Sequence, residues 1–402
     1  MIYRKNQRNG EELSQLGFGC MRFPRKGTAI DILKSADIVH ASIERGVNYF
    51  DTAYIYTGSE DALGKILAGG WREKVNIATK MPLFLVRSGR DFDKFFTEQL
   101  KRLQTDYVDY YMLHCLFDFD YYDKLRSLGV DEWLQKEKER GRIRNIGFSF
   151  HGRSDEFMKI IDAYDWEFCM IQYNYLDENY QAGKAGLKYA HSKDIPVMIM
   201  EPLRGGTLAV NLPDAAMREL KAVDTALDLK NRTPAGWALR WLWNHPEVTL
   251  ALVGMNSAEQ AFENIAAASE AGVGMMSSDE LEAVKKVTQV MHANIKVHCT
   301  SCNYCLPCPA GIDIPSVFSR YNEMGLSGKM SARVHHIASS GIMPSSPRFI
   351  SQCAKCGKCE KVCPQHIKII DELTNAAKTL EPFWAKPLAK IARKFTIGGV
   401  RK

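Results

Sequence analysis

The chain has 402 residues, which is enough for one large domain and a smaller second one. Its hydrophobic fraction of 46% and charged fraction of 25% are those of an ordinary globular protein, and they exclude disordered and fibrous classes. The net charge of +6 is modest, so nucleic-acid binding is not expected, and no apolar run is long enough for a transmembrane segment.

Short β-rich segments alternate with helical patterns from residue 16 to about residue 270. The expected strands are Leu16–Gly19, Tyr49–Ala53, Val75–Lys80, Tyr107–His114, Ile143–Ser149, Phe168–Tyr173, Pro196–Glu201 and Val248–Gly254. The expected helices are Ile30–Arg45, Ser59–Leu67, Phe92–Leu103, Asp131–Arg140, Asn179–His191, Pro234–Asn244 and Ala258–Ala268. This alternation predicts an α/β fold with a closed parallel (β/α)8 TIM barrel. No Gly-x-Gly-x-x-Gly motif joins a strand to a helix, which disfavours a Rossmann site.

A second, smaller region follows the barrel. A helix at Ser278–His292 is expected to close the barrel portion, and a helix at Pro315–Arg333 and a loop at Gly341–Pro347 are expected beyond it. The expected domains are residues 1–294 for the barrel, 295–375 for a small, mainly α-helical ferredoxin-like domain and 376–402 for a basic tail. The tail fits a solvated helix face best, and docking to an acidic redox partner or a membrane surface is the alternative.

Polar residues stand at the ends of three consecutive expected strands. Asp51 follows the second strand with Tyr56 five residues later, Lys80 ends the third strand, and His114 ends the fourth. Because function in such a barrel gathers where the strands end, we expect these four side chains to meet. A lysine beside a tyrosine would lower the pKa of the phenol, an aspartate would keep the lysine charged, and a histidine would hydrogen-bond a substrate oxygen. Taken alone, each of these residues also has an ordinary structural explanation, since buried Asp–Lys pairs and core histidines are common.

Two cysteine runs follow the barrel, Cys299-x-x-Cys302-x-x-Cys305-x-x-Cys308-Pro and Cys353-x-x-Cys356-x-x-Cys359-x-x-x-Cys363-Pro. The spacing resembles that of bacterial two-cluster [4Fe–4S] ferredoxins, in which the fourth cysteine of each run ligates the other cluster. We therefore expect Cys363 to complete the first set of three ligands and Cys308 the second. The first run departs from the pattern, because two residues rather than three precede Cys308.

Zinc and disulfides are the alternative explanations of the cysteines. Zinc sites usually pair two separate Cys-x-x-Cys knuckles, whereas a repeated triple run with Cys-Pro endings favours iron–sulfur clusters. Disulfides need an oxidising compartment, and Met1–Arg8 has no apolar core of a secretory signal. We expect a cytoplasmic protein, and we interpret Cys115 and Cys169 as core residues in preference to redox thiols.

The barrel region, over roughly residues 10–270, resembles the aldo/keto reductases. The matching stretches are Phe50-Asp51-Thr-Ala-x-x-Tyr56-x-x-x-Glu60-x-x-x-Gly64, Lys80, Asp109-Tyr-Tyr-Met-Leu-His114, Ile146-Gly-Phe-Ser149 and Gln172-Tyr-Asn. The resemblance implies that Asp51, Tyr56, Lys80 and His114 are the catalytic residues, and its spacing selects Tyr56 over Tyr54. Within the family, the subgroup with a carboxyl-terminal 4Fe–4S region is the most similar.

The same resemblance implies a nicotinamide cofactor, NADP or NAD. The implied cofactor-binding residues are Ser149, Gln172, Leu203, Arg204, Gly254, Ser257, Gln260 and Asn264. Three features depart from the family. Phe150 replaces the usual asparagine, Met200 replaces the aromatic residue that stacks on nicotinamide, and the segment after Gly254 lacks a lysine or arginine to hold a 2′-phosphate. Arg204 is expected either to supply that charge or to pair with a carboxylate.

Together these features predict an oxidoreductase with two [4Fe–4S] clusters for electron transfer. The barrel would transfer hydride between the nicotinamide and a small carbonyl or alcohol substrate, and the clusters would exchange electrons with a redox protein partner or serve a structural role. The alternatives are a non-catalytic redox sensor or electron-carrying subunit, and a barrel with structural zinc sites.

Overall fold

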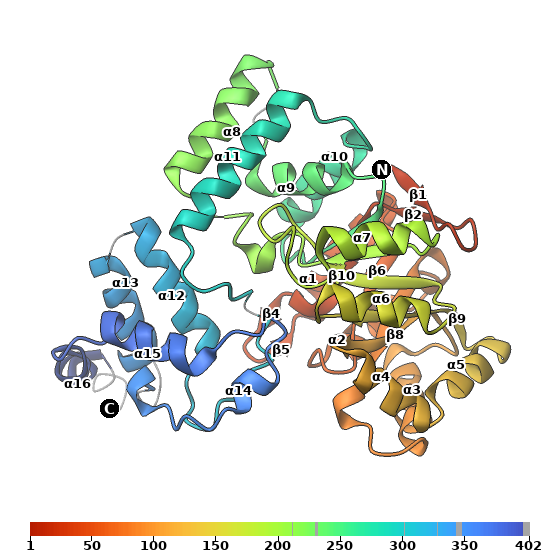
Figure 1. Cartoon of the computed structure of the whole chain (residues 1–402), viewed down its shortest axis with the longest axis horizontal. Helices are drawn as coiled ribbons and strands as arrows, with labels where there is room; N and C mark the ends of the chain where they lie inside the picture. Colours follow the sequence, from red (N-terminus) through yellow and green to blue (C-terminus); the bar gives the residue numbers. More distant parts are fainter. Residues whose placement is uncertain (211, 230–231, 301, 328, 343–347, 397–402) are drawn as a thin grey trace. The chain divides into compact units, whose positions relative to one another are not determined.

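The computed structural model of the chain describes residues 1–210, 212–229, 232–300, 302–327, 329–342 and 348–396 (Figure 1). The chain divides into two compact units, the larger of Met1–Asn211 and Glu219–Lys285 and the smaller of Leu212–Arg218 and Lys286–Lys402. Helices α8 (Asp214–Ala226) and α11 (Ser278–Asn294) each contain a boundary between the units. Among the described residues, no helix combines the length and the apolarity that crossing a lipid bilayer demands.

Eight parallel strands close into a barrel in the larger unit, in the order β10-β11-β12-β3-β6-β7-β8-β9. Their bounds are β3 (Leu16–Gly19), β6 (Tyr49–Asp51), β7 (Asn76–Met81), β8 (Val108–Leu116), β9 (Ile143–Phe150), β10 (Phe168–Gln172), β11 (Val197–Met200) and β12 (Val248–Val253). Each predicted strand is present within a few residues of its expected limits. The predicted (β/α)8 barrel is therefore confirmed.

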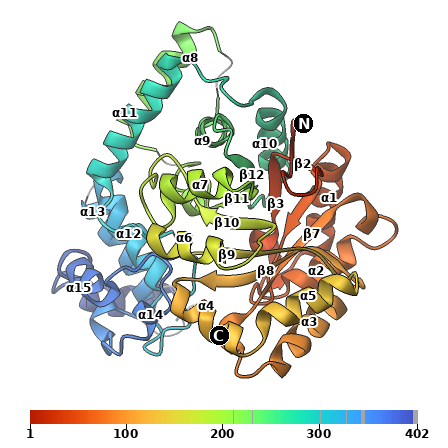
Figure 2. The same cartoon turned by 45° about the vertical axis from the view of Figure 1, so that its right-hand side comes forward.

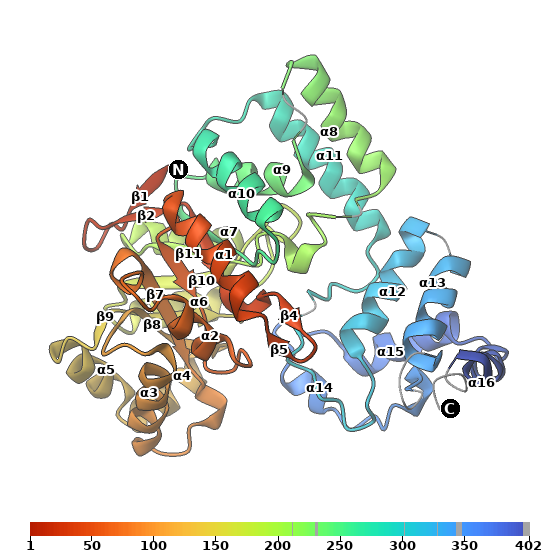
Figure 3. The same cartoon turned by 180° about the vertical axis from the view of Figure 1, so that it is seen from behind.

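Helices cover the outside of the barrel (Figure 2). Figure 3 shows α10, α1 and α2 following one another around it, as their contacts also indicate. The helices of this layer are α1 (Ile32–Glu44), α2 (Ser59–Ile66), α3 (Arg90–Leu103), α4 (Phe119–Ser127), α5 (Val130–Glu139), α6 (Ser154–Asp162), α7 (Gly183–Ser192), α9 (Pro234–Trp243) and α10 (Ala258–Glu270). Short helical turns lie at Cys20–Arg22, Arg72–Lys74, Leu83–Leu85 and Arg204–Gly206.

An amino-terminal hairpin of β1 (Tyr3–Lys5) and β2 (Glu12–Ser14) covers one end of the barrel interior. Leu13 belongs to the buried cluster that fills the barrel, together with Tyr110. The Tyr110 hydroxyl donates to the Glu11 carboxylate at 2.6 Å and accepts from Asn6 Nδ2 at 3.1 Å. These contacts lie at the end of the barrel where the strands begin. The hairpin therefore does not cover the opposite end, where the strands finish and where the candidate catalytic residues are expected. A second hairpin, β4 (Arg25–Lys26) and β5 (Ala29–Ile30), follows β3.

The described residues of the smaller unit form helices and loops and no strand. The helices are α12 (Ile314–Ser327), α13 (Lys329–His336), a π-helical segment at Ile337–Ile342, a short turn at Ile350–Gln352, α14 (Lys358–Lys361), α15 (Ile369–Leu380) and α16 (Ala385–Thr396). Apolar side chains such as Phe318 and Leu373 form a core, and cysteines of both runs pack against it. The core therefore anchors the two cysteine loops.

Two expectations for this region need correction. The helix expected at Pro315–Arg333 is wrong as a single element, because the structure has α12 and α13 in its place. The sequence Gly325-Leu-Ser-Gly328 contains two residues of low helix propensity, which the prediction of one long helix did not take into account. Of the loop expected at Gly341–Pro347, the first two residues belong to the π-helical segment, and residues 343–347 lie outside the described residues.

The basic tail contains the end of α15 and all of α16. Ala385 and Ala389 pack on Ile337 and Phe349. Leu388 and Ile391, in the same helix, are 46% and 55% exposed. Helix α16 thus has one packed side and one exposed side.

Candidate active site and cysteine cavities

A buried ion pair lies at the carboxyl ends of β6 and β7. Lys80 Nζ donates to both carboxylate oxygens of Asp51 at 2.6 Å and to the Thr52 carbonyl at 2.7 Å. Both charged side chains are almost fully buried. Burial raises the pKa of Asp51, and the Lys80 ammonium opposes that rise. The three hydrogen bonds satisfy the lysine donors, which an isolated buried ammonium would lack.

The tyrosine and histidine predicted for the site lie next to this pair. Lys80 Nζ is 5.0 Å from the centre of the Tyr56 ring, and the Tyr56 and His114 ring centres are 6.1 Å apart with planes at 84°. Tyr56 is partly exposed, so its ring is accessible from the barrel mouth. The structure therefore brings together the four residues at successive strand ends.

Tyr54, the rival phenol, has different surroundings. Its ring lies 4.2 Å from the Arg102 guanidinium and 5.2 Å from the Phe95 ring, edge to face. Both neighbours belong to α3, on the outside of the barrel. The packing thus gives the two tyrosines different surroundings, with Tyr54 against α3 and Tyr56 beside Lys80 and His114.

The surroundings of His114 disfavour its charged form. Burial lowers its pKa well below the usual value, and the Lys80 ammonium and the neighbouring His151 lower it further. His151 is itself buried, at 4% exposure. The sequence prediction did not assign His151 to the site, although a histidine two residues beyond Ser149, at the same strand end as the site, was a usable signal.

A close backbone contact holds β8 and β9 together beyond the barrel rim. Cys115 takes a φ of 61°, and its N–H donates to Ser149 Oγ at 2.9 Å. The His151 N–H donates to the Leu116 carbonyl at 2.8 Å. A Cβ on Gly152 would lie 1.7 Å from the Phe117 carbonyl oxygen, so this position requires glycine. The contact fixes the backbone on which His114 and His151 stand.

Gln172 and Arg204 join a buried polar network at the ends of β10 and β11. Gln172 Nε2 donates to Asp177 Oδ2 at 3.1 Å, and its Oε1 accepts from Gln181 Nε2 at 3.1 Å. Arg204 Nε donates to the same Asp177 oxygen at 2.9 Å. Asp177 thus balances the charge of Arg204 inside the barrel. Leu203 precedes the turn and accepts at its carbonyl from Gly206 N.

The remaining residues assigned to the cofactor lie around the start of α10. Ser257 caps this helix and accepts from Gln260 N at 3.3 Å, while Gln260 Oε1 accepts from Asn256 N at 3.0 Å. Asn264, one turn further, is buried, and Gly254 directly follows β12. The amino end of a helix carries partial positive charge that suits a phosphate.

Arg22 adds a full charge at this place. A Cβ on Gly254 would lie 3.3 Å from Arg22 Cβ and from its Cδ, so the arginine stem rests on the glycine. Arg22 is exposed. The sequence prediction found no basic residue near the adenosine-phosphate segment, because Arg22 follows β3, far away in the chain.

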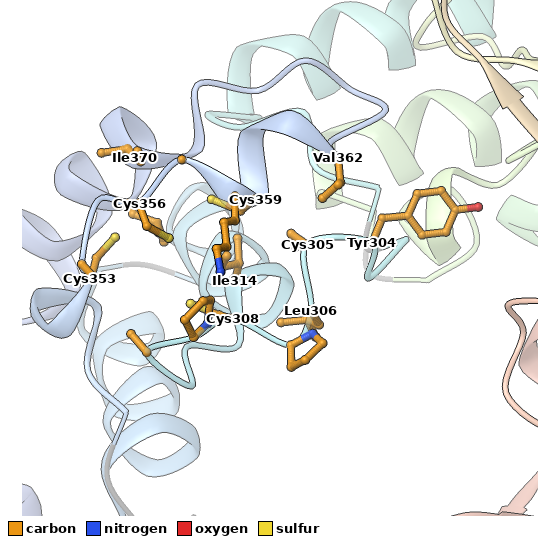
Figure 4. A pocket seen from close by; sticks show the side chains of 17 residues that line it. Tyr304, Cys305, Leu306, Cys308, Ile314, Cys353, Cys356, Cys359, Val362 and Ile370 are labelled. Atoms are coloured by element: carbon orange, nitrogen blue, oxygen red, sulfur yellow. The ribbon is translucent and has the colours of Figure 1, made fainter. Parts of the chain in front are cut away.

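The cysteines of the smaller unit surround two cavities. One is lined by Cys308, Cys353, Cys356, Cys359 and Cys305. In Figure 4 the sulfur atoms of the first four turn toward the space between the two loops, whereas the Tyr304 ring points away. Each cysteine loop thus contributes to this cavity, and four thiols are the number that one [4Fe–4S] cluster takes.

The second cavity is lined by Cys299, Cys302, Cys305 and Cys363. Burial and the nearby thiols of Cys299 and Cys363 raise the pKa of Cys305 to about 12. Burial also raises the pKa of Cys363, while backbone N–H groups of the following residues oppose that rise. Buried thiols at such close range need positive charge to become thiolates, and iron supplies it.

The spacing of these thiols does not suit one ion. Among the described residues, no three His, Cys, Asp or Glu side chains lie close enough to hold a single metal ion. A zinc ion with Zn–S bonds of about 2.3 Å draws its sulfurs to within about 4 Å of one another. A [4Fe–4S] cluster has one iron at each of its four ligands and therefore holds its sulfurs further apart.

Comparison with known proteins identifies the barrel. The model of the aldo/keto reductase family matches residues 15–288, more than half of the chain. The chain belongs to the aldo/keto reductase family. A second model, described as a 4Fe-4S dicluster domain, matches residues 298–368, which contain both cysteine runs. This aldo/keto reductase therefore carries a carboxyl-terminal 4Fe–4S domain, and a zinc-only or disulfide explanation of the cysteines is not supported.

Two of its relatives are named as a dehydrogenase and a reductase. L-galactose dehydrogenase of Arabidopsis thaliana is 30% identical over 297 residues, covering 68% of this aldo/keto reductase and 91% of that protein. The 6-dehydroglucose reductase of Novosphingobium aromaticivorans is 27% identical over 296 residues, covering 65% and 88%. The solved structure of aldo-keto reductase AKR11C1 from Bacillus halodurans, in its holo form, superposes with a TM-score of 0.58 at 26% identity, covering 71% of this chain and 96% of that one.

Proposed function

We propose that the barrel transfers hydride between a nicotinamide dinucleotide and a small carbonyl or alcohol substrate, with Tyr56 as the proton donor and acceptor. The observation that carries the proposal is the chain of contacts from Asp51 through Lys80 to Tyr56, with His114 against the same ring. Residues 1–294 are assigned to this chemistry and 295–375 to the clusters. A reducing compartment, the cytoplasm, is proposed with them, because cluster ligation needs free thiols.

Each residue of the four has a separate task. The Asp51 carboxylate compensates the charge of the buried Lys80 ammonium and orients it toward Tyr56. The ammonium beside Tyr56 stabilises the phenolate, so the phenol gives up its proton more readily than it would in water. His114, neutral because of burial, donates a hydrogen bond to the substrate oxygen without competing for the proton. When bound, the nicotinamide supplies or accepts the hydride at the substrate carbon.

The cofactor would lie across the barrel mouth. Ser149 and Gln172 would hold the carboxamide end, and the start of α10 at Ser257 would face phosphate. Arg22 is the exposed cation that stands there, and it supports binding of a phosphate-bearing cofactor. Whether the cofactor is NADP or NAD depends on whether Arg22 reaches a 2′-phosphate.

We further propose that two [4Fe–4S] clusters occupy the two cysteine cavities. Cys299, Cys302, Cys305 and Cys363 would hold one cluster, and Cys308, Cys353, Cys356 and Cys359 the other. The mixed lining of each cavity supports this crossed assignment. When bound, the clusters accept and release single electrons, and a redox protein is the expected partner.

The test is a steady-state assay of the anaerobically purified protein with NADPH and with NADH. Because two relatives are named for sugars, the substrate panel should pair L-galactose and other aldoses with simple aldehydes. We expect nucleotide-dependent turnover of at least one member of the panel. If the protein binds neither nucleotide and turns over no carbonyl or alcohol, the non-catalytic electron-carrying subunit becomes the better account.

A further inference from the structure

We propose that the second cysteine loop forms the docking surface for an acidic protein that carries one electron at a time. The surface, here called the basic loop, consists of residues 353–368. The proposal rests on the proposed function, since it requires a cluster at Cys308, Cys353, Cys356 and Cys359. Its occupant is a small protein with a negatively charged face and a one-electron redox centre.

The basic loop brings its cluster site to the surface. Cys356 is exposed, whereas Cys363, a ligand of the other proposed cluster, is buried. Val362 lines the same cavity as Cys356 and is 44% exposed. Electron transfer slows steeply with distance, so the site nearest the surface is the one at which an external carrier exchanges electrons fastest.

Positively charged side chains surround the exposed cluster site. Lys355 precedes Cys356, Lys358 precedes Cys359, Lys361 lies three residues further on, and all three are exposed. The Lys355 N–H donates to Cys353 Sγ at 3.5 Å, which fixes that lysine at the cluster site. Among the described residues, none of the three ammonium groups forms an ion pair with a carboxylate.

The carboxylate within the basic loop does not cancel this charge. Glu360 Oε1 accepts from the Ile370 N–H at 2.8 Å and so helps to start α15. Lys368 adds a further exposed cation, so four lysines stand against one carboxylate. Charge of one sign around a redox centre steers an oppositely charged carrier into productive encounters and accelerates association.

The surface suits a protein better than a lipid bilayer. Membrane-binding faces combine basic residues with several large apolar ones. In the basic loop Val362 is the one large apolar side chain that is exposed among the described residues. The exposed apolar residues Phe383, Leu388 and Ile391 belong instead to the segment around α16. At the basic loop the electron carrier loses one electron and the cluster gains it, or the reverse, and no proton or group moves.

The experiment uses the full-length protein with its clusters and a reduced acidic plant-type ferredoxin as the probe. Stopped-flow absorbance measures the second-order rate constant of cluster reduction at low and high ionic strength. The variant K355E/K358E/K361E reverses the charge of the basic loop. The matched control K65E/K136E/K188E changes the net charge equally, at exposed lysines on barrel helices. Dithionite, a small reductant, shows in each sample whether reducible clusters are present.

We expect the loop variant to react at least about tenfold more slowly than the parent at low ionic strength, with the difference disappearing in high salt. The control variant is expected to stay within about threefold of the parent. Equal slowing of both variants, or no slowing of the loop variant, overturns the docking surface while leaving the clusters in place. No bleaching of the parent by dithionite overturns the clusters themselves, and the docking proposal with them.

Discussion

The barrel mouth and the cysteine cavities solve the problem of burying reactive groups in opposite ways. At the barrel mouth, charges already compensate each other, since Lys80 donates to Asp51 and Thr52 and Arg204 to Asp177. In the cavities the reactive groups are thiols of one kind, and burial together with the nearby thiols of Cys299 and Cys363 raises the pKa of Cys305 to about 12.

The two sites therefore differ in whether their geometry depends on a bound group. The catalytic side chains of the barrel are placed by their own hydrogen bonds and by the strands, so their geometry exists without a ligand. The cysteine loops belong to a small helical core whose thiols become compatible with one another once iron supplies positive charge. We therefore expect changes at the barrel mouth to alter rate or barrel stability, and changes at the cysteines to alter metal content.

The largest expected effect is on rate. Tyr56→Phe removes the proton donor and should lower kcat about 10²- to 10⁴-fold. The control Tyr54→Phe changes a ring that packs on Arg102 and Phe95, and kcat should stay within about threefold of the parent. Parallel steady-state assays measure both. Equal rates for Tyr56→Phe and the parent would remove Tyr56 from the mechanism.

The next effect is on stability. Asp51→Asn leaves the Lys80 ammonium buried without its carboxylate, which should cost about 3–5 kcal/mol of unfolding free energy. Asp165→Asn breaks an exposed pair with Arg8 and should have no measurable effect. Urea denaturation followed by tryptophan fluorescence compares the two. A small loss for Asp51→Asn would mean that Lys80 gives up its proton instead.

The pH dependence of barrel stability should be smaller. The folded-state pKa of His114 is depressed, so its contribution is present above the unfolded-state pKa near 6.5 and is lost as pH falls below it. We expect a loss of about 1 kcal/mol between pH 6.5 and pH 5.5 that is absent in His114→Gln. Unfolding curves at the two pH values give the difference. An equal loss of unfolding free energy in His114→Gln would show that other groups cause the pH dependence.

The smallest expected change is a factor of two in metal content. Cys308→Ser and Cys363→Ser each remove one ligand from a different proposed cluster, so iron should fall from about eight to about four per chain in each variant. Cys115→Ser, in the barrel, is the control and should keep the parental iron. Iron analysis after anaerobic purification measures the iron content of each variant. Loss of all iron in both variants would indicate one shared centre and not two.

Local patterns were sufficient for the barrel and for the four residues expected at its mouth. Strand periodicity located the eight strands, and successive strands of a barrel necessarily bring Asp51, Lys80 and His114 to the same end. Cysteine spacing likewise indicated the clusters, because ligands three residues apart share one loop.

Contacts between distant segments could not be predicted in this way. Arg22 contacts Gly254 because β3 pairs with β12 when the barrel closes. The ion pair of Arg204 with Asp177 likewise joins two loops that are far apart in the sequence. Helix α4 was missed because its sequence is rich in tyrosine and aspartate, although Asp118 caps it by accepting from Tyr121 N at 2.7 Å. Nonlocal pairing leaves no periodic signal, so these features depend on the folded structure.

The central claim is that one chain contains both a nicotinamide-dependent proton-relay pocket and two iron–sulfur clusters. Native mass spectrometry of the anaerobically purified protein, with NADP or NAD added, tests it in a single measurement. We expect the mass of the chain plus two [4Fe–4S] clusters, shifted further by one dinucleotide. A chain that carries zinc, one cluster or no metal, or that takes up neither nucleotide, would contradict the account.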